Sequence, residues 1–171
     1  MTNPLRLPAS KILLRLFCLI PMLPLAASAA PVTWDLGLRA AIYDENYKAG
    51  VGGELGAILA ATDGWDLGLH LNYTHFAAKT ENWESVDEMG GYVGAYYKPK
   101  IDQAFWLRIG PHIGYAKVHN NYIDIGGDVM AVFKASPTLD IYGAFIPAFF
   151  AGKDGQTLIR VGFGIEYHAP N

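Results

Sequence analysis

The sequence predicts an all-β fold, namely a closed antiparallel up-and-down transmembrane β-barrel of about eight strands. Three observations support this prediction. Apolar residues alternate with polar or small residues at a period of two from Val32 to His168. The second face of this pattern mixes charged residues with glycine and alanine, as a narrow lumen requires. Aromatic residues on the apolar face gather near the segment ends, as they do at the two interfaces of a bilayer.

Residues 1–29 are predicted to be a cleaved signal peptide, which leaves 30–171 as the barrel domain. Three basic residues precede an apolar run at 16–25, and Ala27-Ser28-Ala29 then fits the A-x-A cleavage pattern. The apolar run is too short to span about 30 Å of hydrocarbon, which argues against an uncleaved membrane anchor. We therefore expect a secreted chain cut after Ala29.

The composition of the mature chain excludes several classes of function. Cys18 is the only cysteine, and it lies in the predicted signal, so no disulfide or thiolate chemistry remains. Cleavage leaves ten basic and sixteen acidic residues, a net charge of about −6, which suits nucleic acid poorly. Beyond the signal there is no uninterrupted apolar stretch of about eighteen residues. The chain is therefore a soluble β-protein or a membrane protein built from strands.

The first four predicted strands cover residues 34–43, 51–61, 65–74 and 89–97. The first has Arg39 opposite a face of tryptophan, leucine, alanine and isoleucine, and the third repeats this arrangement with His70. The second places Glu54 among glycines, and the fourth carries Tyr92 and Tyr96 on its second face. All four therefore have one broad apolar face and one sparse polar face.

The last four predicted strands cover residues 105–115, 123–135, 139–149 and 159–168. The second face carries Arg108 and His112 in the fifth strand, Asp128 in the sixth and Arg160 in the eighth. The seventh alternates less cleanly because apolar residues occupy both of its faces. No helical spacing is sustained past the signal, and an even number of strands is typical of bacterial outer-membrane barrels.

A soluble β-sandwich or a lipocalin-like barrel is the alternative fold. A sandwich buries its apolar face against a second sheet, and a lipocalin-like barrel holds apolar residues inside. Here the polar face is small, as the inside of a narrow barrel must be, whereas the apolar face is broad, as contact with lipid requires. This comparison favours the membrane barrel.

The predicted connections alternate between short and long. The short ones are 62–64, 99–103 and 136–138, and the long ones are 44–48, 79–88, 117–122 and 152–156. Short turns normally face the periplasm and long loops the exterior, so both termini are expected in the periplasm. Pro111 and Pro147 fall inside predicted strands, where we expect β-bulges.

The final strand carries a recognisable pattern. Arg160-Val161-Gly162-Phe163-Gly164-Ile165-Glu166-Tyr167 resembles the signal by which the outer-membrane assembly machinery identifies a last strand. In size and layout the mature chain resembles the small eight-stranded outer-membrane barrels of the OmpA/OmpX type. This resemblance implies the outer membrane of a Gram-negative bacterium, with lipid, lipopolysaccharide and the assembly machinery as partners. That family usually ends on an aromatic residue, whereas four residues follow Tyr167 here.

Seven residues on the second face are predicted to form a charge network in the lumen. They are Arg39, Glu54, His70, Arg108, His112, Asp128 and Arg160. Such charges should pair and hydrogen-bond, because unpaired burial is costly. A narrow pore for small solutes is the alternative, although an eight-stranded barrel usually fills its own interior. No clustered cysteine or histidine gives zinc-like spacing, so we expect no metal and two hydrogen-bonded lumen histidines.

The predicted loop 79–88 is the candidate surface for interactions. Its site residues are Glu81, Trp83, Glu84, Asp87 and Glu88. The simplest interpretation is a solvated, mutually repulsive loop. The functional alternative is contact with lipopolysaccharide phosphates through divalent cations, or with a host or phage partner. Oxygen-rich loops suit Ca²⁺ or Mg²⁺, but this loop lacks an ordered ligand spacing.

The sequence thus predicts a monomeric, non-enzymatic outer-membrane barrel with no cofactor. Its expected role is membrane integrity, surface interaction or adhesion through extracellular loops. An enzyme acting on lipid A, similar to the deacylase or the palmitoyl-transferase barrels, is the first alternative. The palmitoyl-transferase barrels use His, Asp and Ser near the outer rim, where His75, Asp87 and Ser85 could meet here. The His-x-Ser pair of the deacylase barrels is absent. A narrow, porin-like pore is the second alternative.

Overall fold

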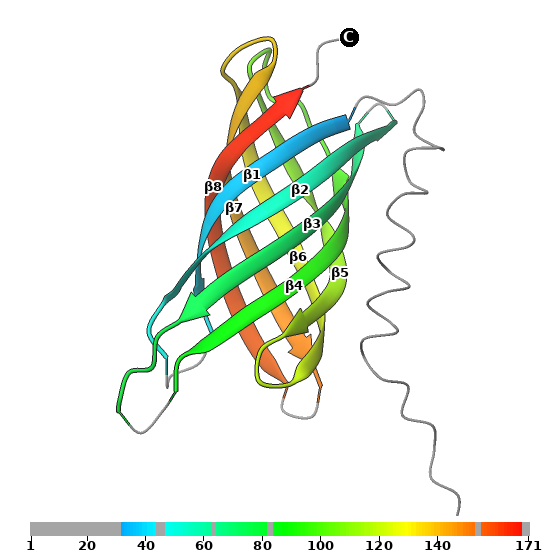
Figure 1. The fold of residues 1–171 in the computed structure, drawn as a ribbon. Coiled ribbons are helices and arrows are strands. Elements are labelled where there is room, and N and C mark those ends of the chain that lie inside the picture. Colours follow the sequence, from blue (N-terminus) through cyan, green and yellow to red (C-terminus); the bar gives the residue numbers. More distant parts are fainter. Residues whose placement is uncertain (1–31, 44–46, 63, 82–83, 153–154, 169–171) are drawn as a thin grey trace, which may run out of the picture. The chain divides into compact units, whose positions relative to one another are not determined.

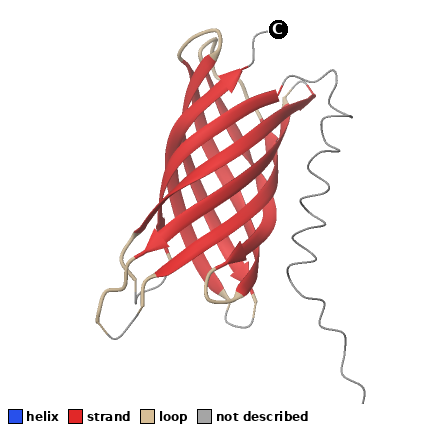
Figure 2. Ribbon diagram, viewed as in Figure 1, coloured by secondary structure: helices blue, strands red, loops and turns tan. Residues whose placement is uncertain are grey.

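The computed structural model describes residues 32–43, 47–62, 64–81, 84–152 and 155–168, which form one closed antiparallel barrel (Figure 1). The strands are β1 (Val32–Ile42), β2 (Gly50–Thr62), β3 (Trp65–Phe76), β4 (Val86–Tyr97), β5 (Phe105–Lys117), β6 (Asn121–Lys134), β7 (Leu139–Ala151) and β8 (Gln156–His168). All regular elements drawn in Figure 2 are strands. No helix in these ranges is long and apolar enough to cross a membrane. The predicted signal peptide, 1–29, lies outside the described residues.

Each strand turns one face inward and the other outward, as the period of two predicts. In β1, Leu36 and Leu38 are 59% exposed, whereas Asp35 is 1% exposed and Arg39 is 4% exposed. This arrangement is the reverse of a soluble protein, in which charged residues are rarely buried and large apolar patches rarely exposed. The exterior therefore suits lipid, and the prediction of a transmembrane barrel of eight strands is confirmed.

Pairing of the first and last strands closes the barrel. Leu38 in the middle of β1 lies opposite Gly53 of β2 on one side and Phe163 of β8 on the other. A closed sheet has no free edge, so the backbone N–H and C=O groups of the wall bond to neighbouring strands instead of to water. Gly64, in the connection from β2 to β3, has a φ of 93°, a left-handed conformation that suits glycine.

The two prolines inside strands do not produce the predicted bulges. Around Pro111 the pairing of β5 with β4 is interrupted, and around Pro147 the pairing of β7 with β6 is interrupted, in both cases without a change of register. Each proline still pairs with the strand on its other side. A missing N–H removes ladder bonds on one side only. The register shift that the described ladders contain lies instead between Ala60 and Thr62 of β2.

The connections alternate in length less regularly than predicted. Residues 118–120 join β5 to β6, because strand residues occupy most of the long loop predicted at 117–122. At the opposite end, residues 98–104 join β4 to β5 and make a longer connection. The longest connection, 77–85, lies between β3 and β4 at the end away from His168 (Figure 1). Loop length alone therefore does not fix the orientation of the barrel.

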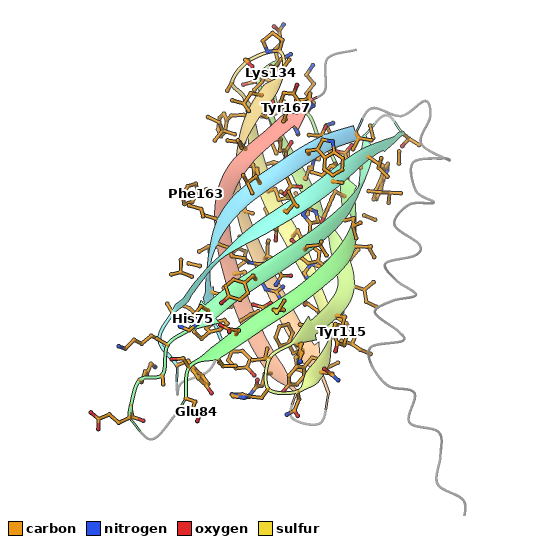
Figure 3. The ribbon with its side chains drawn as sticks, viewed as in Figure 1. His75, Glu84, Tyr115, Lys134, Phe163 and Tyr167 are labelled. Atoms are coloured by element: carbon orange, nitrogen blue, oxygen red, sulfur yellow. The ribbon has the colours of Figure 1, made fainter. Side chains whose placement is uncertain are left out.

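Exterior aromatic rings lie near both ends of the strands. Tyr167 is near the end that carries the C-terminus, Tyr115 is near the other end, and Phe163 is between them (Figure 3). Neighbouring strands pair such rings: the Trp65 and Tyr97 centroids are 5.6 Å apart. Amphipathic rings at these levels match the two interfaces of a bilayer. The band of aliphatic side chains between them is where hydrocarbon is expected.

Leu38→Arg tests this assignment of the exterior. Because Leu38 points outward from the middle of β1, the charge should lower the free energy of unfolding in lipid vesicles by about 2–4 kcal/mol. Ile42→Arg is the matched control, since Ile42 points outward at the end of the same strand and should cost about 0–1 kcal/mol. Equal costs at the two positions would contradict a lipid-facing wall.

Candidate functional site

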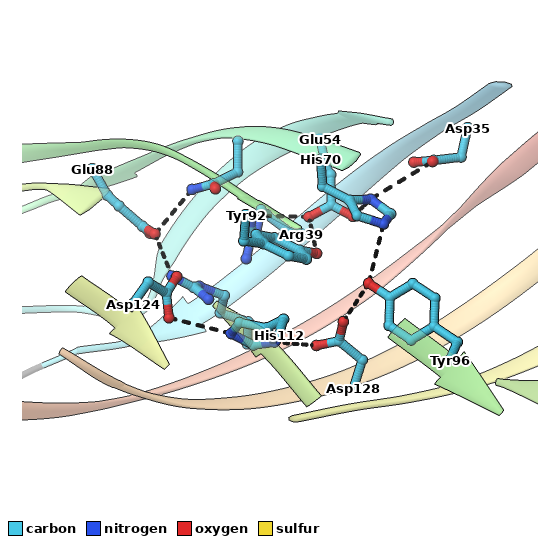
Figure 4. Close-up of polar contacts among 12 residues, drawn as sticks. Asp35, Arg39, Glu54, His70, Glu88, Tyr92, Tyr96, His112, Asp124 and Asp128 are labelled. Carbon is cyan, nitrogen blue, oxygen red and sulfur yellow. Dashed lines mark hydrogen bonds and ion pairs between the residues drawn. The ribbon is translucent and has the colours of Figure 1, made fainter. Parts of the chain in front are cut away.

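The seven predicted lumen residues all lie inside the barrel. Their exposed fractions run from 0% to 7%, because each occupies an inward position of its strand: Arg39, Glu54, His70, Arg108, His112, Asp128 and Arg160. They come from six of the eight strands, so residues far apart in sequence meet across the lumen. Figure 4 shows that most of them form one connected set of polar contacts.

Arg160 of β8 is the cation of the largest group. Its Nη2 donates to Glu88 Oε1 at 2.7 Å and to Asp124 Oδ2 at 2.6 Å. His112 extends the group, with Nδ1 2.7 Å from Asp128 Oδ1 and Nε2 3.3 Å from Asp124 Oδ1. Both ring nitrogens of His112 therefore have carboxylate partners. Charge-assisted bonds of this kind offset part of the cost of burying the ions.

Arg108 of β5 is the cation of a second group, which lies nearer to the start of β1 and the end of β8. Its Nε donates to Asp66 Oδ2 at 2.7 Å, and its Nη1 donates to Glu166 Oε1. Lys98 Nζ lies 3.5 Å from the same oxygen of Asp66. One guanidinium thus connects β3, β5 and β8 across the lumen. Lys134, the last residue of β6, is exposed.

Arg39 and two tyrosines organise a third group. Arg39 Nη1 donates to Glu54 Oε2 at 3.1 Å, and the Tyr92 hydroxyl donates to the same oxygen at 2.9 Å. The Tyr96 hydroxyl lies 2.7 Å from Asp128 Oδ2 and 3.2 Å from His70 Nε2. The sequence placed both tyrosines on the inner face but assigned them no role. Their hydroxyls link the carboxylates into one network (Figure 4).

Glu88 is a correction to the prediction, because it belongs to the lumen and not to a surface loop. Strand β4 begins at Val86, and Glu88 is 0% exposed. Its Oε1 accepts bonds from Arg160 and from Asn72 Nδ2, the latter at 2.9 Å. Extending the alternation of β4 backwards from Tyr92 would have placed Glu88 inside. The acidic residues that precede it made Glu88 look like part of a surface loop.

An apolar cluster occupies the lumen at the end away from the start of β1 and the end of β8. We call it the apolar plug; it consists of Ala41, Tyr43, Tyr47, Phe76, Val86, Ala116, Val118, Tyr122, Phe150 and Leu158. Phe150 stacks on Tyr122 with ring centroids 5.5 Å apart. The guanidinium carbon of Arg160 lies 5.4 Å from the centroid of the Phe150 ring. A smaller apolar cluster of Met130, Val132 and Tyr142 lies on β6 and β7. The sequence did not predict either cluster.

A small cavity lies among the ion pairs of the lumen. A cavity of about 10 Å³ lies beside Arg39, Glu54 and Tyr142, which is room for about one water molecule. The apolar plug and the ion pairs together fill the described interior with side chains. This geometry favours a filled lumen over the open pore that was the alternative.

The surface residues of the predicted loop separate into two sets. Glu81 and Glu84 are exposed in the connection 77–85, and Trp83 lies outside the described residues. Asp87 points outward from β4, where its Oδ1 accepts from His75 Nδ1 at 2.8 Å and from the Tyr73 hydroxyl at 2.9 Å. Figure 3 shows His75 and Glu84 at the same end of the barrel.

The group proposed for an enzyme is only partly assembled. His75 and Asp87 are in contact, with about half of each side chain exposed. Ser85 is exposed two residues before Asp87 in the sequence, but no described contact joins its hydroxyl to His75. A nucleophile within hydrogen-bond reach of its base is the usual mark of acyl transfer. The described residues therefore contain a histidine–carboxylate pair without a paired serine.

Arg160→Met tests the energetic role of the largest ion-pair group. The change leaves Glu88 and Asp124 buried without their cation, so the free energy of unfolding should fall by about 3–5 kcal/mol. Chemical denaturation of the barrel in lipid vesicles measures this fall. Adding Glu88→Gln to the variant removes one orphaned charge and should restore part of the loss. An Arg160→Met barrel of unchanged stability would contradict the pairing.

Comparison with known proteins supports the fold. No protein-family model matches the chain, and no curated protein matches its sequence. Solved structures do match: Neisserial surface protein A has a TM-score of 0.56 at 12% identity, over 82% of this chain and 97% of that one. Ail, the attachment invasion locus protein of Yersinia pestis, has a TM-score of 0.54 at 12% identity, over 82% of this chain and 97% of that one.

A third match is the outer membrane protein OprG from Pseudomonas aeruginosa, with a TM-score of 0.58 at 9% identity, over 84% of this chain and 97% of that one. Identities this low establish likeness of fold and nothing about activity. The predicted resemblance to the small barrels of the OmpA/OmpX type is confirmed at that level. The chain has the fold of a small eight-stranded outer-membrane β-barrel.

Proposed function

We propose that this chain is a non-enzymatic outer-membrane barrel that supports membrane integrity and meets surface ligands through its extracellular loops. The filled lumen is the observation that carries the proposal. Ion pairs occupy its middle, and the apolar plug occupies one end. A barrel without an open interior can act only through its lipid-facing wall and its loops.

The orientation is part of the same proposal: both termini lie in the periplasm, and the connection 77–85 lies outside the cell. The final strand supports this orientation, since Arg160 to Tyr167 resembles the signal for outer-membrane assembly. The position of 77–85, the longest connection, agrees with it.

The charge of the connection 77–85 limits its ligands. Glu81 and Glu84 are exposed there, and carboxylates repel the phosphates of lipopolysaccharide. Divalent cations such as Ca²⁺ or Mg²⁺ bind carboxylate and phosphate oxygens together. The proposed partner is therefore a lipopolysaccharide layer bridged by divalent cations.

Deletion of the gene tests the role in the membrane. Cells without the protein should take up more of a hydrophobic fluorescent dye, and expression of the unmodified chain should restore the barrier. Glu81→Gln with Glu84→Gln should weaken Mg²⁺-dependent binding of the purified barrel to lipopolysaccharide vesicles. Asp102→Asn, at the opposite end, is the matched control. Unchanged dye uptake together with unchanged vesicle binding would contradict the proposal.

A lipid A-modifying enzyme is the second candidate, favoured by the 2.8 Å contact between His75 Nδ1 and Asp87 Oδ1. Because no described contact supplies a nucleophile, we expect no reaction. Mass spectra of lipid A from cells with and without the protein should be identical. An altered acylation pattern that disappears with His75→Asn and with Ser85→Ala would establish the enzyme instead.

A further inference from the structure

The buried charges of the lumen do not balance. Among the described residues, eight buried carboxyl groups accompany three buried guanidinium groups, those of Arg39, Arg108 and Arg160, and two buried histidines, His70 and His112. Seven of the eight carboxyl groups accept a hydrogen bond from an arginine, histidine, tyrosine or asparagine side chain. Asp35 is the exception: it is 1% exposed, and neither of its oxygens has a donor among the described residues. Burial of an uncompensated carboxylate is strongly unfavourable.

Asp35 points toward two further groups that can bind a cation. Its Oδ2 lies 3.6 Å from His70 Nδ1, and Glu54 Oε1 lies 3.4 Å from the same nitrogen. One ligand atom from each residue lies within 4.8 Å of the other two. His70 Nδ1 is buried and forms no hydrogen bond with the described residues. Figure 4 shows the three side chains, from β1, β2 and β3, converging.

The Tyr96 hydroxyl determines which nitrogen of His70 carries hydrogen. A phenol has one hydrogen to donate, and the shorter contact, 2.7 Å, is to Asp128 Oδ2. His70 Nε2, 3.2 Å from the same hydroxyl, must then be the donor in that contact. In the neutral ring this leaves the lone pair of Nδ1 facing Asp35 and Glu54. With His70 neutral, three electron-pair donors thus lie within 4.8 Å of one another.

The surrounding side chains hold the three groups in this arrangement. Arg39 and Tyr92 both bond Glu54 Oε2, which leaves Oε1 directed at His70. The Tyr92 ring stacks on the His70 ring with centroids 4.8 Å apart and an interplanar angle of 16°. Gly56 leaves room beside them, because a Cβ there would lie 2.6 Å from His70 Nδ1. Metal ligands are commonly oriented by such outer contacts.

We propose that Asp35, Glu54 and His70 form a binding site for a divalent transition-metal ion, with Zn²⁺ as its best-suited occupant. Zinc binds imidazole nitrogen and carboxylate oxygen at about 2.0–2.2 Å, so neighbouring ligand atoms of a tetrahedral site lie about 3.3–3.6 Å apart. The two measured separations, 3.4 and 3.6 Å, fall in this range. The ion would supply the positive charge that Asp35 lacks and would connect three strands.

Two other histidines near buried carboxylates, His112 and His168, do not share this geometry. Both ring nitrogens of His112 contact carboxylates. His168, grouped with Asp140 and Glu166 at the rim, contacts Thr33 Oγ1 through Nδ1 at 3.0 Å and Asp140 through Nε2. Neither ring has a nitrogen free to bind a metal. They supply matched controls.

The test measures metal in the full barrel extracted in detergent from outer membranes of cells grown with zinc. After dialysis against a chelator, elemental analysis should find about one zinc ion per chain. X-ray absorption at the zinc edge should show nitrogen and oxygen neighbours at about 2.0–2.2 Å. Asp35→Asn and His70→Gln should lose the zinc, and Tyr96→Phe should lower the affinity by about 10–100-fold.

His112→Gln and His168→Gln are the controls and should keep the zinc. Faster gel mobility of the unboiled sample establishes that each variant still forms a barrel. If the unmodified barrel contains no zinc, the proposal is wrong, and a protonated His70 is then the partner of Asp35. Zinc that survives in Asp35→Asn and His70→Gln, or that is lost only in His168→Gln, would equally overturn it.

Discussion

The width of the lumen is the constraint on which the rest of this structure depends. Eight strands enclose a space that side chains can fill and bulk water cannot, so each inward polar group must find its partner on another strand. Arg108 and Arg160 meet this requirement by contacting two carboxylates each. Where such partners are absent, as at the apolar plug, the lumen is filled by aromatic and aliphatic side chains.

The same constraint explains why the tyrosines matter. A phenol reaches across a narrow lumen, fills volume and still offers one donor, so Tyr92 gives Glu54 a second donor beside Arg39, and Tyr96 connects Asp128 with His70. Breaking one contact leaves a buried charge that water cannot rescue. The polar contacts of the interior therefore stabilise the barrel by pairing groups on different strands.

Most of the fold was predictable because alternation is local. Inward Arg39 and outward Leu38 follow from a period of two within a single strand. The predictions failed where the pairing between strands, and not the local pattern, decided the structure. Glu88 looked like part of an acidic loop until β4 was seen to begin at Val86. Pro111 and Pro147 looked like bulge positions, yet the ladders tolerate them with interruptions on one side.

The sequence by itself determined the barrel, its strand number and which side of each strand faces lipid, because these follow from residue spacing along the chain. The tertiary structure alone decided which charges meet. Asp35, Glu54 and His70 lie on three different strands, and only the register of β1, β2 and β3 brings their side chains together. No spacing in the sequence encodes such a convergence, since the pairing register of neighbouring strands sets which of their residues lie side by side.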